Sequence, residues 1–240
     1  MKSFLTAFLM AMATMGLSAM AVPATGVKGT AHDLSITGEN AATLTVQVCV
    51  FCHTPHNAAA AGAQLIPLWN KATTASLFTM YNYANNVNNH LTPGLTIDAS
   101  PQGVSLACLS CHDGTLAVGD VLNAPDDGGN TTYNAAYTGL DAAGKIIDTK
   151  TKIGTDLSND HPIGITYRDD LNMSGPLGTA GLNSASGLTL VKLFPTNATG
   201  SKVQCASCHD VHNHGVDKVT APFLRDTMVS SKLCSNCHIK

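Results

Sequence analysis

Regular patterns of hydrophobic and polar residues are short in this chain. Apolar and polar residues alternate over 44–48, 145–153 and 188–194, which predicts a short strand in the first stretch and short hairpin strands in the other two. Proline, glycine and aspartate mark turns at 125–129, and proline and glycine do so again at 174–178. We therefore expect a mostly irregular, loop-rich fold with a small β-hairpin.

The N-terminus has the pattern of a secretory signal peptide. Lys2 precedes an apolar run from Phe4 to Met15, and small residues follow, with cleavage expected after Ala21 or as late as Ala24. The run is too short and too early to be a membrane-spanning helix, and no later stretch approaches the required length. We expect an exported chain, with residues 22–240 forming a single domain.

All eight cysteines lie in a pentapeptide, CxxCH, that occurs four times. This pattern is the attachment signature of c-type haem. Two cysteines three residues apart share one face of a helical turn, so both thiols can bond to the vinyl groups of one porphyrin, and the histidine that follows becomes the proximal iron ligand. The motifs predict four covalent haems c, with short helices, at Cys49, Cys52 and His53; Cys108, Cys111 and His112; Cys205, Cys208 and His209; and Cys234, Cys237 and His238.

Two other uses of cysteine pairs compete with haem. A zinc ribbon pairs two CxxC motifs per metal and does not require a histidine after every second cysteine. A disulfide framework suits a small exported domain but does not require CxxCH four times. Haem also accounts for the composition, with only 5% aromatic residues and one tryptophan, because four apolar macrocycles can form the core of a thin polypeptide wrapper.

Six histidines outside the motifs are candidates for the distal iron positions. We predict His32, His56, His161 and His212 as distal ligands, with His214 and His90 in reserve. Other roles stay open: a surface position for His32 or His90, a hydrogen bond to a haem propionate for His56, and a plain turn for His161, which precedes a proline.

Two of these candidates follow a proximal histidine by three residues, His56 after His53 and His212 after His209. The two axial ligands of one iron approach from opposite faces of the porphyrin, which two residues on one turn cannot do. If His56 and His212 are ligands, each therefore serves a different haem, and that arrangement brings two macrocycles close together.

An iron with two histidine ligands has no open position for a substrate. Six candidates for four vacancies favour bis-histidine ligation throughout, which predicts a low-potential electron carrier and not an enzyme. The formal net charge of −3, without a basic block, argues against a nucleic-acid partner.

Several blocks together resemble the multihaem cytochromes of metal-reducing bacteria, in particular the tetrahaem outer-surface cytochromes that polymerise into extracellular nanowires. The similarity is carried by the haem motifs and their flanks, namely His-Asp-Leu-Ser at 32–35, Cys-Val-Phe-Cys-His-Thr-Pro-His-Asn at 49–57, Cys-Leu-Ser-Cys-His-Asp-Gly at 108–114, Asn-Asp-His-Pro at 159–162, Cys-Ala-Ser-Cys-His-Asp-Val-His-Asn at 205–213 and the last CxxCH.

The resemblance implies bis-histidine haems stacked in a continuous chain, with one subunit lending a histidine to a haem of the next. Carried onto this sequence, His56 is the expected donor, with His32 and His90 as alternatives. It implies a homopolymeric filament at the outer surface or outside the cell that passes electrons to external acceptors or other cytochromes. A soluble periplasmic tetrahaem shuttle is the alternative, and a multihaem oxidoreductase with one open haem ranks third.

Overall fold

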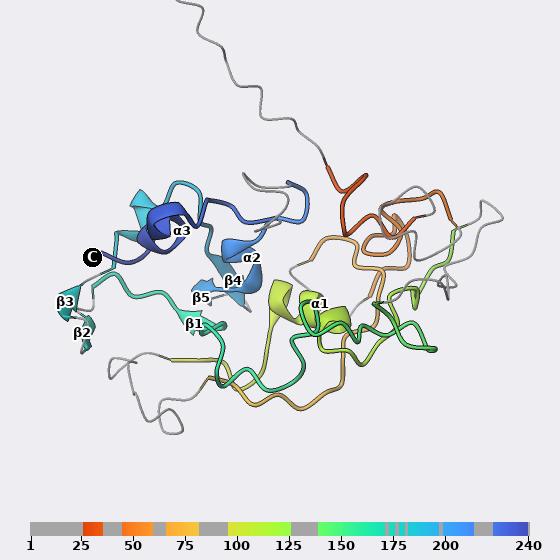
Figure 1. Cartoon of the computed structure of the whole chain (residues 1–240), viewed down its shortest axis with the longest axis horizontal. Coiled ribbons are helices and arrows are strands. Elements are labelled where there is room, and N and C mark those ends of the chain that lie inside the picture. Colours follow the sequence, from red (N-terminus) through yellow and green to blue (C-terminus); the bar gives the residue numbers. More distant parts are fainter. Residues whose placement is uncertain are drawn as a thin grey trace, which may run out of the picture.

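The computed structural model describes the chain at residues 26–35, 45–59, 66–81, 96–125, 139–170, 173–175, 178–180, 182–196, 199–213 and 223–239. Most of these residues lie in turns and loops, with a few helices and small sheets (Figure 1). The predicted signal peptide, residues 1–21 or 1–24, lies outside the described residues, as do His90 and His214.

Each α-helix of the described residues overlaps a CxxCH motif. The first motif contains one helical turn, closed by the 2.8 Å bond from the His53 amide to the Cys49 carbonyl. The second motif forms the end of the longest helix. The third motif forms a single helical turn, and the fourth begins within the last helix. The helices are α1 (Gly103–His112), α2 (Cys205–Cys208) and α3 (Lys232–Ser235), with 3-10 turns η1 (Ala185–Gly187) and η2 (Val229–Ser231).

Helix α1 ends where the sequence places Asp113 and Gly114. The Asp113 amide donates to the Leu109 carbonyl at 3.0 Å, and Gly114 then takes a φ of +77°, a conformation that terminates helices. A Cβ atom at Gly114 would lie 3.0 Å from the Ile146 carbonyl oxygen, so this position excludes larger residues on both counts.

Two small antiparallel sheets lie in the C-terminal half. The first has the order β1–β5–β4, with Ile165 opposite Val203 and Phe194 opposite Lys202. The second is a two-stranded hairpin, β2–β3, around the predicted turn at 174–178. Their bounds are β1 (Ile165–Thr166), β2 (Met173–Gly175), β3 (Gly178–Ala180), β4 (Phe194–Thr196) and β5 (Thr199–Val203).

Of the three strands predicted from alternating residues, two are absent from the described residues and the third is displaced towards the C-terminus. Residues 45–48 contain no strand, because the Thr45 hydroxyl accepts the Gln47 amide at 3.1 Å and closes a local turn instead. Residues 188–193 also lack a strand, and β4 begins only at Phe194.

The predicted hairpin strands over 145–153 are replaced by single bridges and a turn. Lys145 bridges to Ala117 and Ile146 to Leu140, so neighbouring residues pair with different segments. Asp148 then accepts the Lys150 amide on its carboxylate at 3.0 Å, which turns the chain before a strand can extend.

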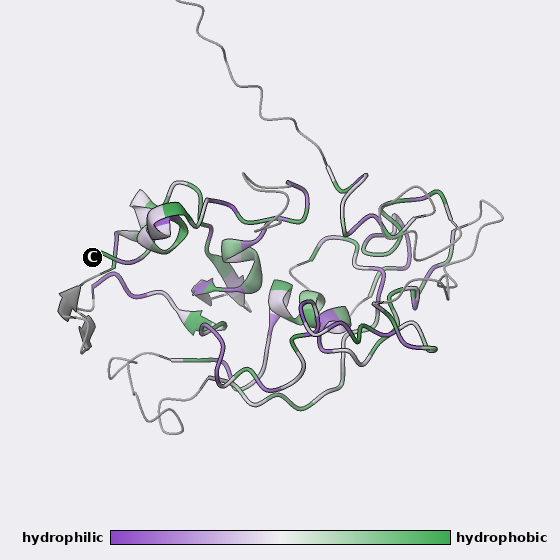
Figure 2. Cartoon of the chain, viewed as in Figure 1, coloured by the Kyte–Doolittle hydropathy of each residue, from purple (hydrophilic) through white to green (hydrophobic). Residues whose placement is uncertain are grey.

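The described residues pack around few apolar side chains. Phe51 and Leu109 are almost fully buried, and Trp69 packs against Ala107 of α1, but hydrophilic and hydrophobic residues are interspersed along the loops (Figure 2). Helix α1 lies between the described N-terminal loops and the sheets and helices of the C-terminal half (Figure 1). Within the described part of the chain, no helix has the length and hydrophobicity that a membrane crossing requires.

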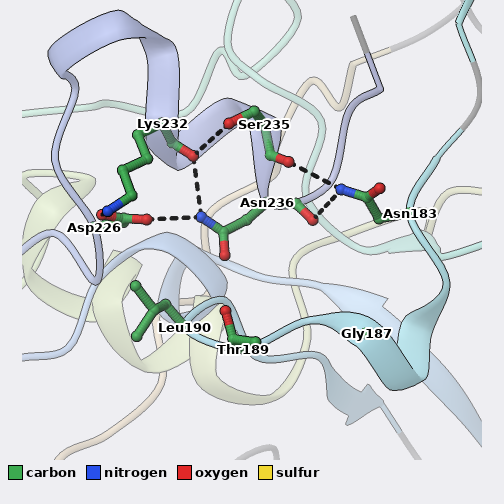
Figure 3. A pocket seen from close by; sticks show the side chains of 8 residues that line it. All are labelled: Asn183, Gly187, Thr189, Leu190, Asp226, Lys232, Ser235 and Asn236. Atoms are coloured by element: carbon green, nitrogen blue, oxygen red, sulfur yellow. Dashed lines mark hydrogen bonds and ion pairs between the residues drawn. The ribbon is translucent and has the colours of Figure 1, made fainter.

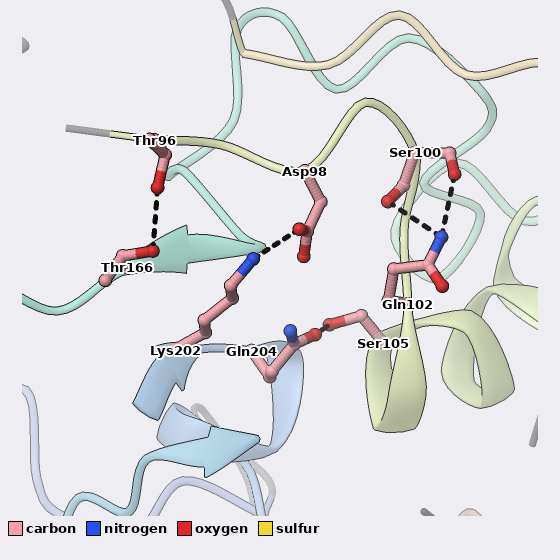
Figure 4. Close-up of polar contacts among 8 residues, drawn as sticks. All are labelled: Thr96, Asp98, Ser100, Gln102, Ser105, Thr166, Lys202 and Gln204. Carbon is pink, nitrogen blue, oxygen red and sulfur yellow. Dashed lines mark hydrogen bonds and ion pairs between the residues drawn. The ribbon is translucent and has the colours of Figure 1, made fainter. Parts of the chain in front are cut away.

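A buried polar junction joins α1 to α2, the helices of the second and third motifs (Figure 4). Ser105 donates to the side-chain carbonyl of Gln204, and the Ser105 hydroxyl accepts the Cys205 amide at 3.0 Å. Gln204 and Ser207 form a capping box at the start of α2. Both serines and Gln204 are buried, so these bonds fix the relative position of the two motifs.

Candidate functional site

Three of the four motifs accept the same kind of backbone hydrogen bond from a segment outside the motif. In each, a remote residue donates its amide to the carbonyl of the second motif cysteine: Asn70 to Cys52 at 2.9 Å, Arg225 to Cys208 at 2.8 Å and Asn183 to Cys237 at 2.8 Å. In the remaining motif the His112 carbonyl accepts the Ile153 amide at 2.7 Å. Each motif histidine is therefore held by a segment distant in sequence.

Three motif histidines each face a histidine from outside the motifs. The ring centroids of His112 and His32 lie 6.0 Å apart, with an angle of 60° between the ring planes. Those of His53 and His212 lie 6.1 Å apart at 23°, and those of His238 and His161 lie 6.4 Å apart at 74°. Every pair combines one predicted proximal ligand with one predicted distal ligand.

These separations suit two imidazoles that share one metal ion. A metal–imidazole bond is about 2 Å long and the ring centre lies roughly 1 Å beyond the nitrogen, so two ligands on opposite sides of an ion have centres roughly 6 Å apart. Direct ring stacking would bring the centroids closer, to about 4.5 Å at the lower end. The three pairs therefore leave room for an iron and the plane of a macrocycle.

Hydrogen bonds orient two of the motif rings for metal binding. Nδ1 of His53 lies 2.8 Å from the Pro67 carbonyl oxygen, and Nδ1 of His112 lies 2.7 Å from the Thr151 carbonyl oxygen. A carbonyl only accepts, so each Nδ1 carries the proton and Nε2 keeps its lone pair. This is the arrangement in which metal-binding histidines are commonly held.

His32 is held in its neutral form. Burial, assisted by His112, His209 and His212, lowers its pKa to about 4. Its Nδ1 is buried and has no hydrogen-bond partner among the described residues, while its ring packs edge-on against Phe223 with centroids 4.6 Å apart. A neutral imidazole with a buried nitrogen and no partner suits a metal ligand, which must bind through an unprotonated nitrogen.

The eight motif thiols are free, and all except those of Cys49 and Cys234 are partly buried. Burial raises the pKa of the Cys208 thiol to about 11, and a hydrogen bond to Cys205, together with burial, raises the pKa of Cys108 well above its usual value. Burial disfavours the thiolate and is compatible with a neutral thioether. The contact between Cys108 and Cys205 also shows that the second and third motifs are direct neighbours in space.

The remaining histidines named as candidate ligands are not found in these ring pairs. His56 is exposed, and among the described residues none of the histidine ring pairs includes it. His209, the third motif histidine, is also exposed and bridges to Leu224. His90 and His214 lie outside the described residues, so their predicted reserve roles stay predictions.

The fourth motif borders a polar pocket of about 330 Å³ (Figure 3). Asn183 donates to the Ser235 and Asn236 carbonyls, both at 2.9 Å, and Asn236 donates to the Asp226 carboxylate at 2.9 Å. These bonds fix the two variable residues of the motif and so orient His238 after them.

Sequence reasoning missed the side chains that support the motif histidines. Trp69 lies edge-on to His53 with centroids 6.4 Å apart, and its buried indole nitrogen has no partner among the described residues. Lys71, two residues further on, is almost fully buried. Neither residue belongs to a motif, and backbone pairing of their segment with the first motif, such as that of Asn70 with Cys52, brings them to the site.

Comparison of the chain with protein-family models and with curated proteins finds no match. Among the described residues, no group of three or more histidine, cysteine, aspartate or glutamate side chains is placed to hold a metal ion. A haem iron takes four of its ligands from the porphyrin and needs only two from the protein. The three histidine pairs would supply that number, and the neighbouring cysteines would supply the attachment points.

Proposed function

We propose that this protein transfers electrons through four covalently attached c-type haems, each with two histidine ligands. The proposal rests on three histidine pairs. The ring centroids lie 6.0 Å apart for His112 and His32, 6.1 Å apart for His53 and His212, and 6.4 Å apart for His238 and His161. Each motif histidine follows two cysteines that can attach the same macrocycle.

The pairs support a closed coordination sphere at three irons. When bound, a haem supplies a one-electron couple, and two imidazole ligands leave no position for a substrate or for dioxygen. The protein residues attach the macrocycle, orient the axial rings and bring successive motifs together, as the Cys108–Cys205 contact does for the second and third. An electron carrier, not an enzyme, is the function that this arrangement favours.

We further propose that the protein is a subunit of an extracellular filament that conducts electrons to external acceptors. The support is the sequence resemblance together with the exposed position of His56. If all three pairs ligate iron, the distal ligand of the iron at His209 comes from His56, His90 or His214, in the same chain or a neighbouring one. His56 is the best donor to an adjacent subunit.

Cryo-electron microscopy of the purified holoprotein tests both parts of the proposal. We expect filaments in which every chain holds four haems and one distal histidine crosses to the next subunit. Monodisperse monomers with all irons ligated from their own chain would reject the filament and leave a soluble tetrahaem shuttle. An oxidised spectrum with a high-spin, five-coordinate component would instead favour an enzyme.

A further inference from the structure

A buried lysine lies between the first two motifs. Lys71 is only 1% exposed, and its ammonium group donates to the backbone carbonyls of Ala117 at 2.9 Å, Val118 at 3.2 Å and Asp120 at 2.6 Å. No carboxylate among the described residues forms an ion pair with it. Carbonyl oxygens are suitable acceptors for an ammonium group, but they carry no formal negative charge that would balance it.

The position of this charge is fixed relative to both motifs. Asn70, the preceding residue, donates its amide to the Cys52 carbonyl at 2.9 Å and its side chain to the Val50 carbonyl at 2.6 Å. The carbonyls that Lys71 binds belong to the segment just after the second motif. Lys71 is therefore linked to the first motif through Asn70 and to the second through these carbonyls.

The two attachment sites differ in what balances this cation. Asp113 directly follows the second motif, and Asp120 lies in the segment whose carbonyls Lys71 binds. Asp113 is buried and accepts bonds from the Thr115 amide and hydroxyl, both at 2.8 Å, which hold its carboxylate in place. Within the described residues 45–59, which contain the first motif, no residue is acidic. The first site therefore contains an unbalanced cation, and the second contains charges of both signs.

We propose that Lys71 raises the reduction potential of the haem at Cys49 and Cys52 above that of the haem at Cys108 and Cys111. This inference rests on the proposed attachment of haem at both motifs. Reduction adds one negative charge to the iron centre, and a buried cation stabilises that added charge strongly because the surrounding dielectric constant is low. With haem bound at both motifs, this difference would favour electron transfer from the second haem to the first, a step that breaks no bond and moves no proton.

The test is a spectroelectrochemical titration of the holoprotein and three variants. Lys71→Gln removes the charge but keeps a donor for the carbonyls, Lys71→Arg keeps the charge, and Lys192→Gln removes an exposed charge as the matched control. We expect one reduction step, that of the first haem, to move to more negative potential in Lys71→Gln alone. An unchanged titration in Lys71→Gln, or an equal shift in Lys192→Gln, overturns the inference.

A measurement on the wild-type holoprotein tests the inference even if Lys71→Gln does not fold. Electron paramagnetic resonance signals of the first and second haems are assigned by their loss in His212→Ala and His32→Ala. During stepwise reduction, the signal of the first haem should disappear before that of the second, and the reverse order contradicts the inference. The haem content is measured by mass in parallel. A wild-type chain without haem at both motifs rejects the proposed function itself. Normal haem content with the reverse order of reduction rejects only the role of Lys71.

Discussion

His53 and His212 lie with their ring centroids 6.1 Å apart and their planes at 23°, although they belong to the regions of the first and third motifs. His212 follows His209 by three residues, so it cannot reach the opposite face of the porphyrin that its own motif would hold. If both rings bind one iron, as proposed, the third motif region completes the first site. A single side chain then couples two motif regions that are far apart in the sequence.

Replacing His212 should open one haem in four. In His212→Ala, the iron held by His53 loses its distal imidazole, so we expect a high-spin component in the oxidised spectrum and carbon monoxide binding by one haem per chain after reduction. Absorption spectroscopy with carbon monoxide titration measures both effects. Asn213→Ala, at the adjacent exposed position, is the control and should bind none. Retention of four low-spin haems in His212→Ala would contradict the pairing.

The ring angles predict two kinds of spectroscopic signal. Nearly parallel axial imidazoles, as at His53 and His212, split the two iron orbitals that interact with them and give a rhombic low-spin signal. Angles of 60° at His112 and 74° at His238 leave these orbitals closer in energy and give signals with a large maximum g value. Low-temperature electron paramagnetic resonance of the oxidised protein should show both kinds, and His32→Ala should remove a large-g signal. A spectrum with only rhombic signals would be incompatible with these angles.

The junction between α1 and α2 should contribute measurably to stability. Ser105→Ala removes one of the bonds to the Gln204 side chain and leaves the Cys205 amide without its buried side-chain acceptor, at a cost of about 1–3 kcal/mol in the free energy of unfolding. Chemical denaturation of the holoprotein followed by circular dichroism measures this change. Ser100→Ala, at an exposed position nearby, should change it by less than about 0.5 kcal/mol. Equal stabilities of the two variants would show that the junction contributes little.

The position of His56 gives a prediction about assembly. If its exposed ring completes a haem in the next subunit, His56→Ala should keep four haems per chain but lose filaments. The physical reason is that a metal–ligand bond across the interface is replaced by a methyl group. Electron microscopy detects the filaments, and haem quantification of the same preparation gives the number of haems per chain. The matched histidine variant His90→Ala should still polymerise, and filaments formed by His56→Ala would assign the donor elsewhere.

The sequence predicted the positions of the helices better than those of the strands. The spacing within CxxCH requires a helical turn, and Gly114 ends α1 where its φ of +77° demands glycine. The alternation at 145–153 was misleading because Lys145 and Ile146 each form a single bridge with a different segment. Because the described residues bury few apolar side chains, a short alternation of apolar and polar residues does not indicate a strand with one buried face.

The histidine partners show a second limit of sequence reasoning. The spacing of three residues established that His212 could not serve the iron beside it, but any of the other motif histidines could have been its partner on sequence alone. The choice of His53 depends on the contacts that bring the third motif to the first, and Lys71 reaches the site through backbone pairing that carries no sequence signature.

Intact-mass measurement of the mature holoprotein combined with carbon monoxide titration of its reduced form tests the central claim most directly. We expect the measured mass to exceed that of the polypeptide by four haems, one for each CxxCH motif, and the reduced spectrum to stay unchanged with carbon monoxide. A mass corresponding to fewer than four haems, or binding of carbon monoxide by the protein as isolated, would contradict it.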